Sequence, residues 1–185
     1  MHELIENRWS ARGYDPAATI STTDLTTILE AGRWAPTWGR VQPIRFIVGM
    51  RGDETFGKIS ETLTRGNAGW APASAALILV CTADEPDDEK ARTYADVDTG
   101  LAVAQMILQA GSLGFNGHPM AGFDPEKARA AFAIPADRRA LVLLGIGRLA
   151  DPTTVADDIR ERDQRPRTRL PLDQVAFAGS WGQPF

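Results

Sequence analysis

Residues 75–83, AALILVCTA, form a nearly unbroken apolar run in the middle of the chain. A strand that is apolar on both faces is stable only where other elements cover both faces, so the run predicts a central strand of a layered fold. Further strands are predicted at 45–49 (RFIVG) and 140–148 (ALVLLGIGR), with helical patterns between them. Strands separated by helices are typical of an α/β or an α+β architecture.

Apolar residues at helical spacing predict four helices, at residues 21–34, 53–65, 97–115 and 126–134. The first opens on Ser21 with Asp24 three positions later, which resembles a capping box. The third is apolar on most sides, which is typical of a helix in a domain centre or a subunit interface. Residues 84–89 (DEPDDE) and 116–125 (NGHPMAGFDP) are predicted to be loops.

Length and charge narrow the class of protein. A chain of 185 residues can bury one substantial core, and we expect a single domain over 1–185. The net charge of −4 argues against a nucleic-acid partner, since such proteins usually carry a basic face. No apolar run reaches the length of a membrane span, and the charged N-terminal stretch MHELIENRWS is unlike a signal peptide. We therefore expect a cytoplasmic protein with no membrane association.

The composition changes at residue 151. Residues 151–185 contain few aliphatic side chains, several arginines and several prolines, so this segment cannot form a core of its own. It is either a disordered tail or an arm that packs over another surface. Val175, Phe177 and Trp181 favour packing, because a free tail rarely keeps such apolar anchors.

Several kinds of catalytic site lack their components. His2 and His118 are the only histidines, and no ligand cluster surrounds them, so a zinc site is not indicated. The chain has no Gly-x-Ser-x-Gly elbow and no P-loop, and GIGR is too short for a dinucleotide fingerprint. The single Cys81 lies in the apolar run, as a buried small side chain would. What remains favours a protein that holds an organic cofactor and lets the cofactor react.

The segment NRWSARGYDP, residues 7–16, holds Arg8, Ser10 and Arg12 at alternate positions. In an extended backbone this spacing places all three side chains on one face. Two guanidinium groups and a hydroxyl on one face suit a phosphate, although a solvated edge would look the same.

Five segments, in order along nearly the whole chain, then resemble the FMN-dependent nitroreductase family. They are the Arg-x-Ser-x-Arg at Arg8–Arg12, APTWGRVQPI at 35–44, QMILQAGSLGF at 105–115, the Pro-x-x-Gly-Phe at Pro119–Phe123 and RTRLPL at 167–172. The chain departs from the family where Arg40 replaces an asparagine and Ala121 replaces a frequent glutamate.

The resemblance implies an α+β layered fold, with a mostly antiparallel sheet flanked by helices and a C-terminal arm, 151–185, exchanged in a homodimer. It implies FMN as cofactor and NAD(P)H as electron donor. Hydride would pass through flavin N5 to a nitroaromatic, a quinone or a related small acceptor by a ping-pong mechanism. The flavin itself would transfer the hydride, so no catalytic side chain is assigned.

The resemblance also implies a set of cofactor contacts. The phosphate and ribityl chain would be held by Arg8, Ser10, Arg12, Arg167 and Arg169. The polar edge of the flavin ring would be lined by Pro36, Thr37, Arg40 and Gln42, with Trp9 and Trp38 as pocket walls. The loop at Pro119, Met120, Ala121 and Gly122 would present a backbone N–H to flavin N5.

Two other functions stay open at this point. A relative with the same fold could run a different reaction, such as a dehydrogenation or a dehalogenation. The chain could also be a non-catalytic flavin-binding protein, if Trp38 blocks the nicotinamide face. No turnover of NADH or NADPH with a quinone or nitroaromatic acceptor would favour the first alternative. Flavin binding without bleaching by a reductant would support the second.

Overall fold

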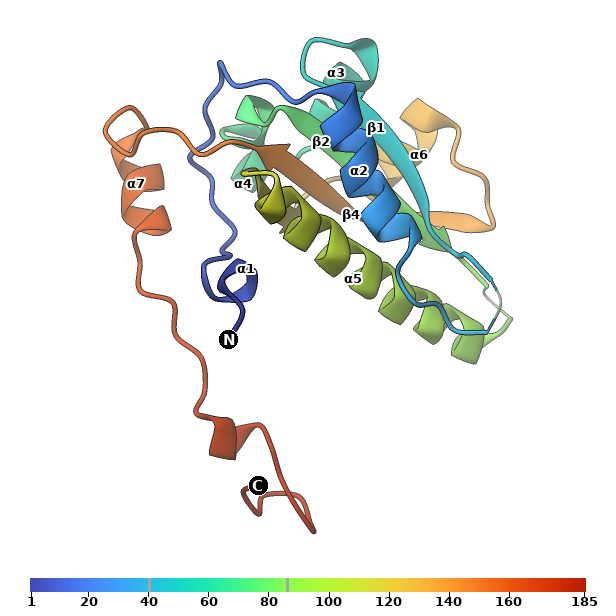
Figure 1. Ribbon diagram of the computed structural model, residues 1–185. Coiled ribbons are helices and arrows are strands. Elements are labelled where there is room, and N and C mark those ends of the chain that lie inside the picture. The colour runs from blue at the N-terminus through green and yellow to red at the C-terminus, as the bar shows by residue number, and fades with distance from the viewer. Residues whose placement is uncertain (40, 86) are drawn as a thin grey trace.

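The computed structural model describes residues 1–39, 41–85 and 87–185. Its centre is a four-stranded sheet in the order β1-β2-β4-β3, in which every neighbouring pair is antiparallel (Figure 1). The strands are β1 (Arg45–Met50), β2 (Ala76–Ala83), β3 (Asn116–Met120) and β4 (Arg138–Gly147). The fold is α+β, as the family resemblance implies.

The apolar run at 75–83 forms the inner strand β2, and its prediction as a central strand is confirmed. Every residue from Ala76 to Thr82 is buried. Ile78 and Val80 pack on one face of the sheet, and Leu77 and Leu79 pack on the other. Each face therefore has its own apolar core.

Helices cover both faces (Figure 1). One face carries α2 (Thr22–Arg33) and the long α5 (Glu89–Ser112). The other carries α3 (Glu54–Ser60), α4 (Arg65–Ala68), the 3-10 turn Ala71–Ala73 and α6 (Pro125–Phe132). The N-cap prediction for α2 is confirmed, since Ser21 Oγ accepts the backbone N–H of Asp24 at 3.0 Å.

The prediction of a loop over 116–125 is wrong in its first half, because these residues form β3. Asn, Gly and Pro disfavour strands, and the local sequence NGHPM carries no strand pattern. The strand exists because it pairs with β4, with His118 opposite Gly145. Proline is tolerated there because β3 is an edge strand of the sheet.

The predicted start of the long helix is also wrong. Helix α5 begins at Glu89, because Asp88 caps it by accepting the backbone N–H of Ala91 at 2.9 Å. The end of the acidic stretch thus lies at the positive end of the helix dipole, where carboxylates are stabilising. The helix predicted over 53–65 ends earlier, at Ser60.

The N-terminal segment meets the first part of the C-terminal arm beside the sheet (Figure 1). The N-terminal segment follows α1 (Glu3–Glu6), and the C-terminal arm contains α7 (Asp157–Asp163) and the 3-10 turn Leu172–Gln174. Beyond α7 the arm runs away from the sheet (Figure 1). Among the aromatic pairs of the described residues, the ring of Trp181 pairs only with Phe177 of the same arm, at a centroid distance of 5.1 Å.

The side chain of Trp181 is 91% exposed, so Phe177 covers little of its surface. The single domain over 1–185 stays a prediction. In the part of the chain that the structure describes, no helix combines the length and the apolar character that crossing a bilayer requires.

Candidate cofactor site

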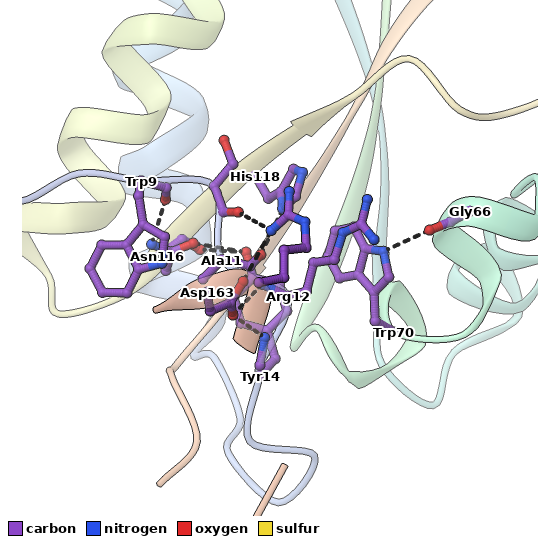
Figure 2. A network of polar contacts seen from close by, with 12 residues as sticks. Trp9, Ala11, Arg12, Tyr14, Gly66, Trp70, Asn116, His118 and Asp163 are labelled. Carbon is purple, nitrogen blue, oxygen red and sulfur yellow. Dashed lines mark hydrogen bonds and ion pairs between the residues drawn. The ribbon is translucent and has the colours of Figure 1, made fainter. Parts of the chain in front are cut away.

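The N-terminal segment is fastened to the edge strand β3 by two side chains of that strand (Figure 2). His118 Nδ1 lies 2.6 Å from the carbonyl oxygen of Ala11, and Asn116 Nδ2 donates to the carbonyl of Trp9 at 3.0 Å. A carbonyl can only accept, so the His118 proton sits on Nδ1. These two bonds hold two alternate backbone carbonyls of the segment against β3.

The ring of Trp70 packs against two side chains of this network, His118 and Arg12 (Figure 2). Its ring stacks on His118 at a centroid distance of 4.4 Å, and the guanidinium of Arg12 lies 5.5 Å from the ring centroid. Its indole N–H donates to the Gly66 carbonyl at 3.1 Å. Burial lowers the pKa of Arg12, and the positive charge of Arg162 lowers it further. Arg12 Nε is buried with no hydrogen-bond partner among the described residues.

Arg8 gathers with two arginines of the C-terminal arm. Its Nη1 donates to Ser10 Oγ at 3.4 Å, and Arg167 Nη1 donates to the Arg8 carbonyl at 2.6 Å. Burial lowers the pKa of Arg8, and the charges of Arg167 and Arg169 act in the same direction. None of the three guanidinium groups forms an ion pair within the described ranges. Three cations with no carboxylate partner are the chemistry of an anion site.

The loop after β3 is shaped by Gly122. Its carbonyl accepts the N–H of Thr64 at 3.1 Å and Asn67 Nδ2 at 3.0 Å. A Cβ on Gly122 would lie 2.5 Å from Asn67 Nδ2, so only glycine allows this close approach. Pro119 and Met120 end β3, and Met120 is buried in the core below. The backbone N–H groups of Ala121 and Gly122 bond no described residue, and they stay candidate donors for a ligand.

The other predicted ring contacts lie at a different end of the molecule. The backbone N–H of Trp38 donates to the buried carboxylate of Asp98 at 2.9 Å, and its ring stacks on Tyr94 at 5.2 Å. Gln42 Nε2 donates to the Arg33 carbonyl at 3.3 Å. Pro36 and Thr37 precede them in the same loop, and Arg40 lies outside the described residues.

Helix α5 separates this loop from the arginine cluster within one chain. The loop meets α5 at Asp98, whereas Leu4 of α1 packs near Gly111. These two positions are about 20 Å apart along the helix axis. One chain therefore brings the N-terminal segment together with the C-terminal arm and with β3. It does not bring the described loop residues, 36–39 and 41–42, to the same place.

Sequence reasoning missed several members of the site. Asp163 and Arg162 stand in the charged stretch RERD, which looks like an ordinary solvated helix face. Asn67 lies in the short helix α4 and Trp70 follows it, in a stretch with no pattern that points to a ligand. The sequence indicates no role for His118, since it lacks the partners of a zinc site, and the structure shows it as a buried hydrogen-bond donor.

His118 gives the protein an expected pH dependence. Burial lowers its pKa, so the unfolded chain binds a proton more readily than the folded chain. The associated stability is complete above the unfolded pKa of about 6.5 and is lost as the pH falls through that value toward the folded pKa. The free energy of unfolding should therefore decrease between about pH 7 and pH 5.

The matched variant is His118→Asn, whose amide keeps a donor for the Ala11 carbonyl but does not titrate. Urea unfolding across this pH range should give a flatter profile for the variant than for the wild type. Parallel profiles would contradict the assignment to His118.

Fold and site together define a class: an α+β protein in which guanidinium groups from both ends of the chain lie near one another beside the sheet. The model of the nitroreductase family matches residues 5–64 and 51–148, and the chain belongs to this family. It is an oxidoreductase.

Three relatives illustrate the likeness. An uncharacterized 15.4 kDa protein of Mycolicibacterium smegmatis is 50% identical over 77% of this chain and 100% of its own length. YdgI of Bacillus subtilis, named as a candidate NAD(P)H nitroreductase, is 28% identical over 94% of this chain and 95% of its own. A crystal structure described as an oxidoreductase containing FMN superposes with a TM-score of 0.90, at 30% identity, over 99% of this chain and 93% of that one.

Proposed function

We propose that the chain binds FMN and uses it to carry hydride from NAD(P)H to a small acceptor, a nitroaromatic or a quinone, in a ping-pong sequence. The observation that carries the proposal is the cluster of Arg8, Arg167 and Arg169, which forms no ion pair in the described part of the chain. A phosphate monoester, with close to two negative charges at neutral pH, supplies the missing anion. The FMN-containing structural relative and the name of YdgI support the two cofactors.

Each part of the site has a role in holding the cofactor. Arg8, Arg167 and Arg169 neutralise the phosphate, with Ser10 as a further hydrogen-bond donor. The backbone N–H groups of Ala121 and Gly122 face the ring. FMN, when bound, supplies the redox chemistry, by accepting two electrons from the donor and passing them to the acceptor. The chain orients the reactants and excludes water from them.

A second copy of the chain completes the site. The described loop residues, 36–39 and 41–42, do not reach the arginine cluster of their own chain, because α5 separates them. Helix α5 also exposes an apolar stripe of Tyr94, Val97 and Leu101, of which Trp38 covers only part of Tyr94. We assign this stripe to a homodimer interface, and the exposed apolar side chains of the arm 151–185 to packing on the partner.

The purified protein is expected to be a yellow dimer that releases FMN on denaturation. Addition of NADH or NADPH without oxygen should bleach the flavin band, and a quinone or a nitroaromatic should restore it. A released cofactor other than FMN, or a band that neither donor bleaches, would contradict the proposed reaction.

The same experiment on Leu101→Glu tests the need for a second copy. A charge in the apolar stripe should give a colourless monomer, because both the interface and the completed site are lost. Ala130→Glu, on exposed α6 at the opposite face of the sheet, adds the same charge and should stay a yellow dimer. A yellow Leu101→Glu monomer would show that one chain is sufficient.

A further inference from the structure

Asp163, the last residue of α7, holds the N-terminal segment through two adjacent backbone amides (Figure 2). Its Oδ2 accepts the N–H of Arg12 and the N–H of Gly13, each at 2.8 Å. The side chain is 15% exposed, so water competes little for these bonds. Charge-assisted bonds to an ionised acceptor are about twice as strong as neutral ones.

The backbone is adapted to this contact at Gly13. A Cβ there would lie 3.2 Å from Val155 Cγ1 and 3.4 Å from Asp163 Oδ2. The contact with Val155, which precedes α7, is tight, so even an alanine here would require that side chain to shift by a few tenths of an ångström. Glycine therefore lets the segment preceding α7 pack closely on the chain.

The other carboxylate oxygen of Asp163 is linked to Ser10 through Arg162. Asp163 Oδ1 accepts Arg162 Nη1 at 3.0 Å, and the same Nη1 donates to the Ser10 carbonyl at 3.0 Å. One residue pair on α7 thus fixes the backbone at Ser10, Arg12 and Gly13. The side chains of Ser10 and Arg12 leave this fixed backbone toward the site.

We propose that Asp163 is a positioning residue that fixes the backbone of 10–13 for recognition of a ligand's phosphate group. This inference rests on the proposed function, because it concerns the same site. A carboxylate beside an anion site repels the anion through space, so its net benefit must come from the two amide hydrogen bonds. The two effects have opposite signs, which makes them separable by experiment.

Asp158 provides the matched control on the same helix. It is exposed, and its negative charge raises the pKa of Arg12, as the charge of Asp163 does. Within the described ranges it makes no hydrogen bond to residues 8–14. Asp158→Asn therefore removes one negative charge near Arg12 without touching the backbone amides.

The experiment measures dissociation constants for FMN and for riboflavin, which lacks the phosphate, with the full-length wild type, Asp163→Asn and Asp158→Asn. Loss of the paired bonds should raise the Kd for FMN about tenfold in Asp163→Asn. Its Kd for riboflavin should change less than about twofold, since phosphate contacts are absent. Asp158→Asn should leave the Kd for FMN unchanged or lower it.

A second readout does not depend on a cofactor. In the ligand-free protein, hydrogen exchange at the Arg12 and Gly13 amides should be faster in Asp163→Asn than in Asp158→Asn. Equal losses for FMN and riboflavin would reduce Asp163 to a general structural role and overturn the inference. Tighter FMN binding in both variants, or unchanged exchange, would overturn it as well.

Failure of the proposed function has a different signature, because the wild type would then bind neither flavin. The probe is in that case inorganic phosphate, measured by the rise in Tm that it causes in the wild type and both variants. If phosphate raises the Tm of the wild type and of Asp158→Asn but not that of Asp163→Asn, the positioning role is supported. An equal rise in Tm in all three proteins overturns it.

Discussion

Replacing Arg167 and Arg169 together by alanine is expected to raise the Kd for FMN by about 10²–10⁴-fold. A hydrogen bond to a charged group contributes about 1.5–3 kcal/mol, and two such contacts sum to about 3–6 kcal/mol. Both arginines come from the arm and lie close enough to Arg8 to lower its pKa. Titration of the apoprotein with FMN, followed by the quenching of flavin fluorescence, measures the effect.

The control for charge is Lys58→Ala/Lys127→Ala, which removes two exposed cations from α3 and α6, neither of which contributes to the arginine cluster. It should change the Kd for FMN by less than about twofold, because exposed charges at such distances are screened by salt. Equal losses in the two double variants would show that net charge, and not the cluster, attracts the cofactor.

Arg169→Ala is expected to change stability and FMN affinity in different directions. In the described structure its only side-chain hydrogen bond is to its neighbour, the Thr168 carbonyl, so little structure is lost with it. Removing one of three like charges should leave the Tm of the FMN-free protein unchanged or raise it, while the affinity for FMN falls. A variant that loses Tm and affinity together would contradict an anion site.

Gly49→Ala is expected to destabilise the fold by about 3 kcal/mol or more, the upper range for overpacking a core. A Cβ on Gly49 would lie 2.4 Å from the backbone nitrogen of Phe56 and 2.5 Å from its Cα. These are main-chain atoms of α3, so the helix would have to move off β1 and expose the buried Phe56 ring. Urea unfolding should show a lower free energy of unfolding, with a Tm lower by about 6–12 °C.

Gly57→Ala, on the same short helix, is the matched control. Nothing in the described structure lies within 4 Å of the Cβ that it would add. Alanine favours a helix over glycine by about 0.8–1.0 kcal/mol, so this variant should be slightly more stable than the wild type. If Gly49→Ala were as stable as Gly57→Ala, the close approach of α3 to β1 would be disproved.

The sequence anticipated the parts of the site that depend on local geometry. Arg8 and Ser10 meet because alternate residues of an extended segment share a face. The family motif also marked Gly122 in the Pro-x-x-Gly-Phe loop. The structural reason for a glycine there is the close approach of Asn67 Nδ2, which is a tertiary contact. Whether these residues contact FMN stays a prediction.

Contacts between distant residues were out of reach of sequence reasoning. Asp163 bonds Arg12 across 151 positions, and His118 bonds Ala11 across 107. No periodicity within a window of a few turns encodes such a pairing. The exposed stretch that contains Asp163 has the composition of a solvated helix, so nothing marked one of its carboxylates as partly buried.

The amino-acid sequence alone was sufficient for β2 and α2. An apolar run of that length has to be covered on both faces, and a serine cap followed by apolar residues at helical spacing begins a helix. Only the folded chain could make Asn116–Met120 a strand, since its residues favour a turn until β4 offers hydrogen bonds. Only the folded chain could bring the arginines of the two ends to one place. The physical reason is the same in both cases: local preferences are worth tenths of a kcal/mol to about 1 kcal/mol per residue, and packing and hydrogen bonds between distant segments exceed them.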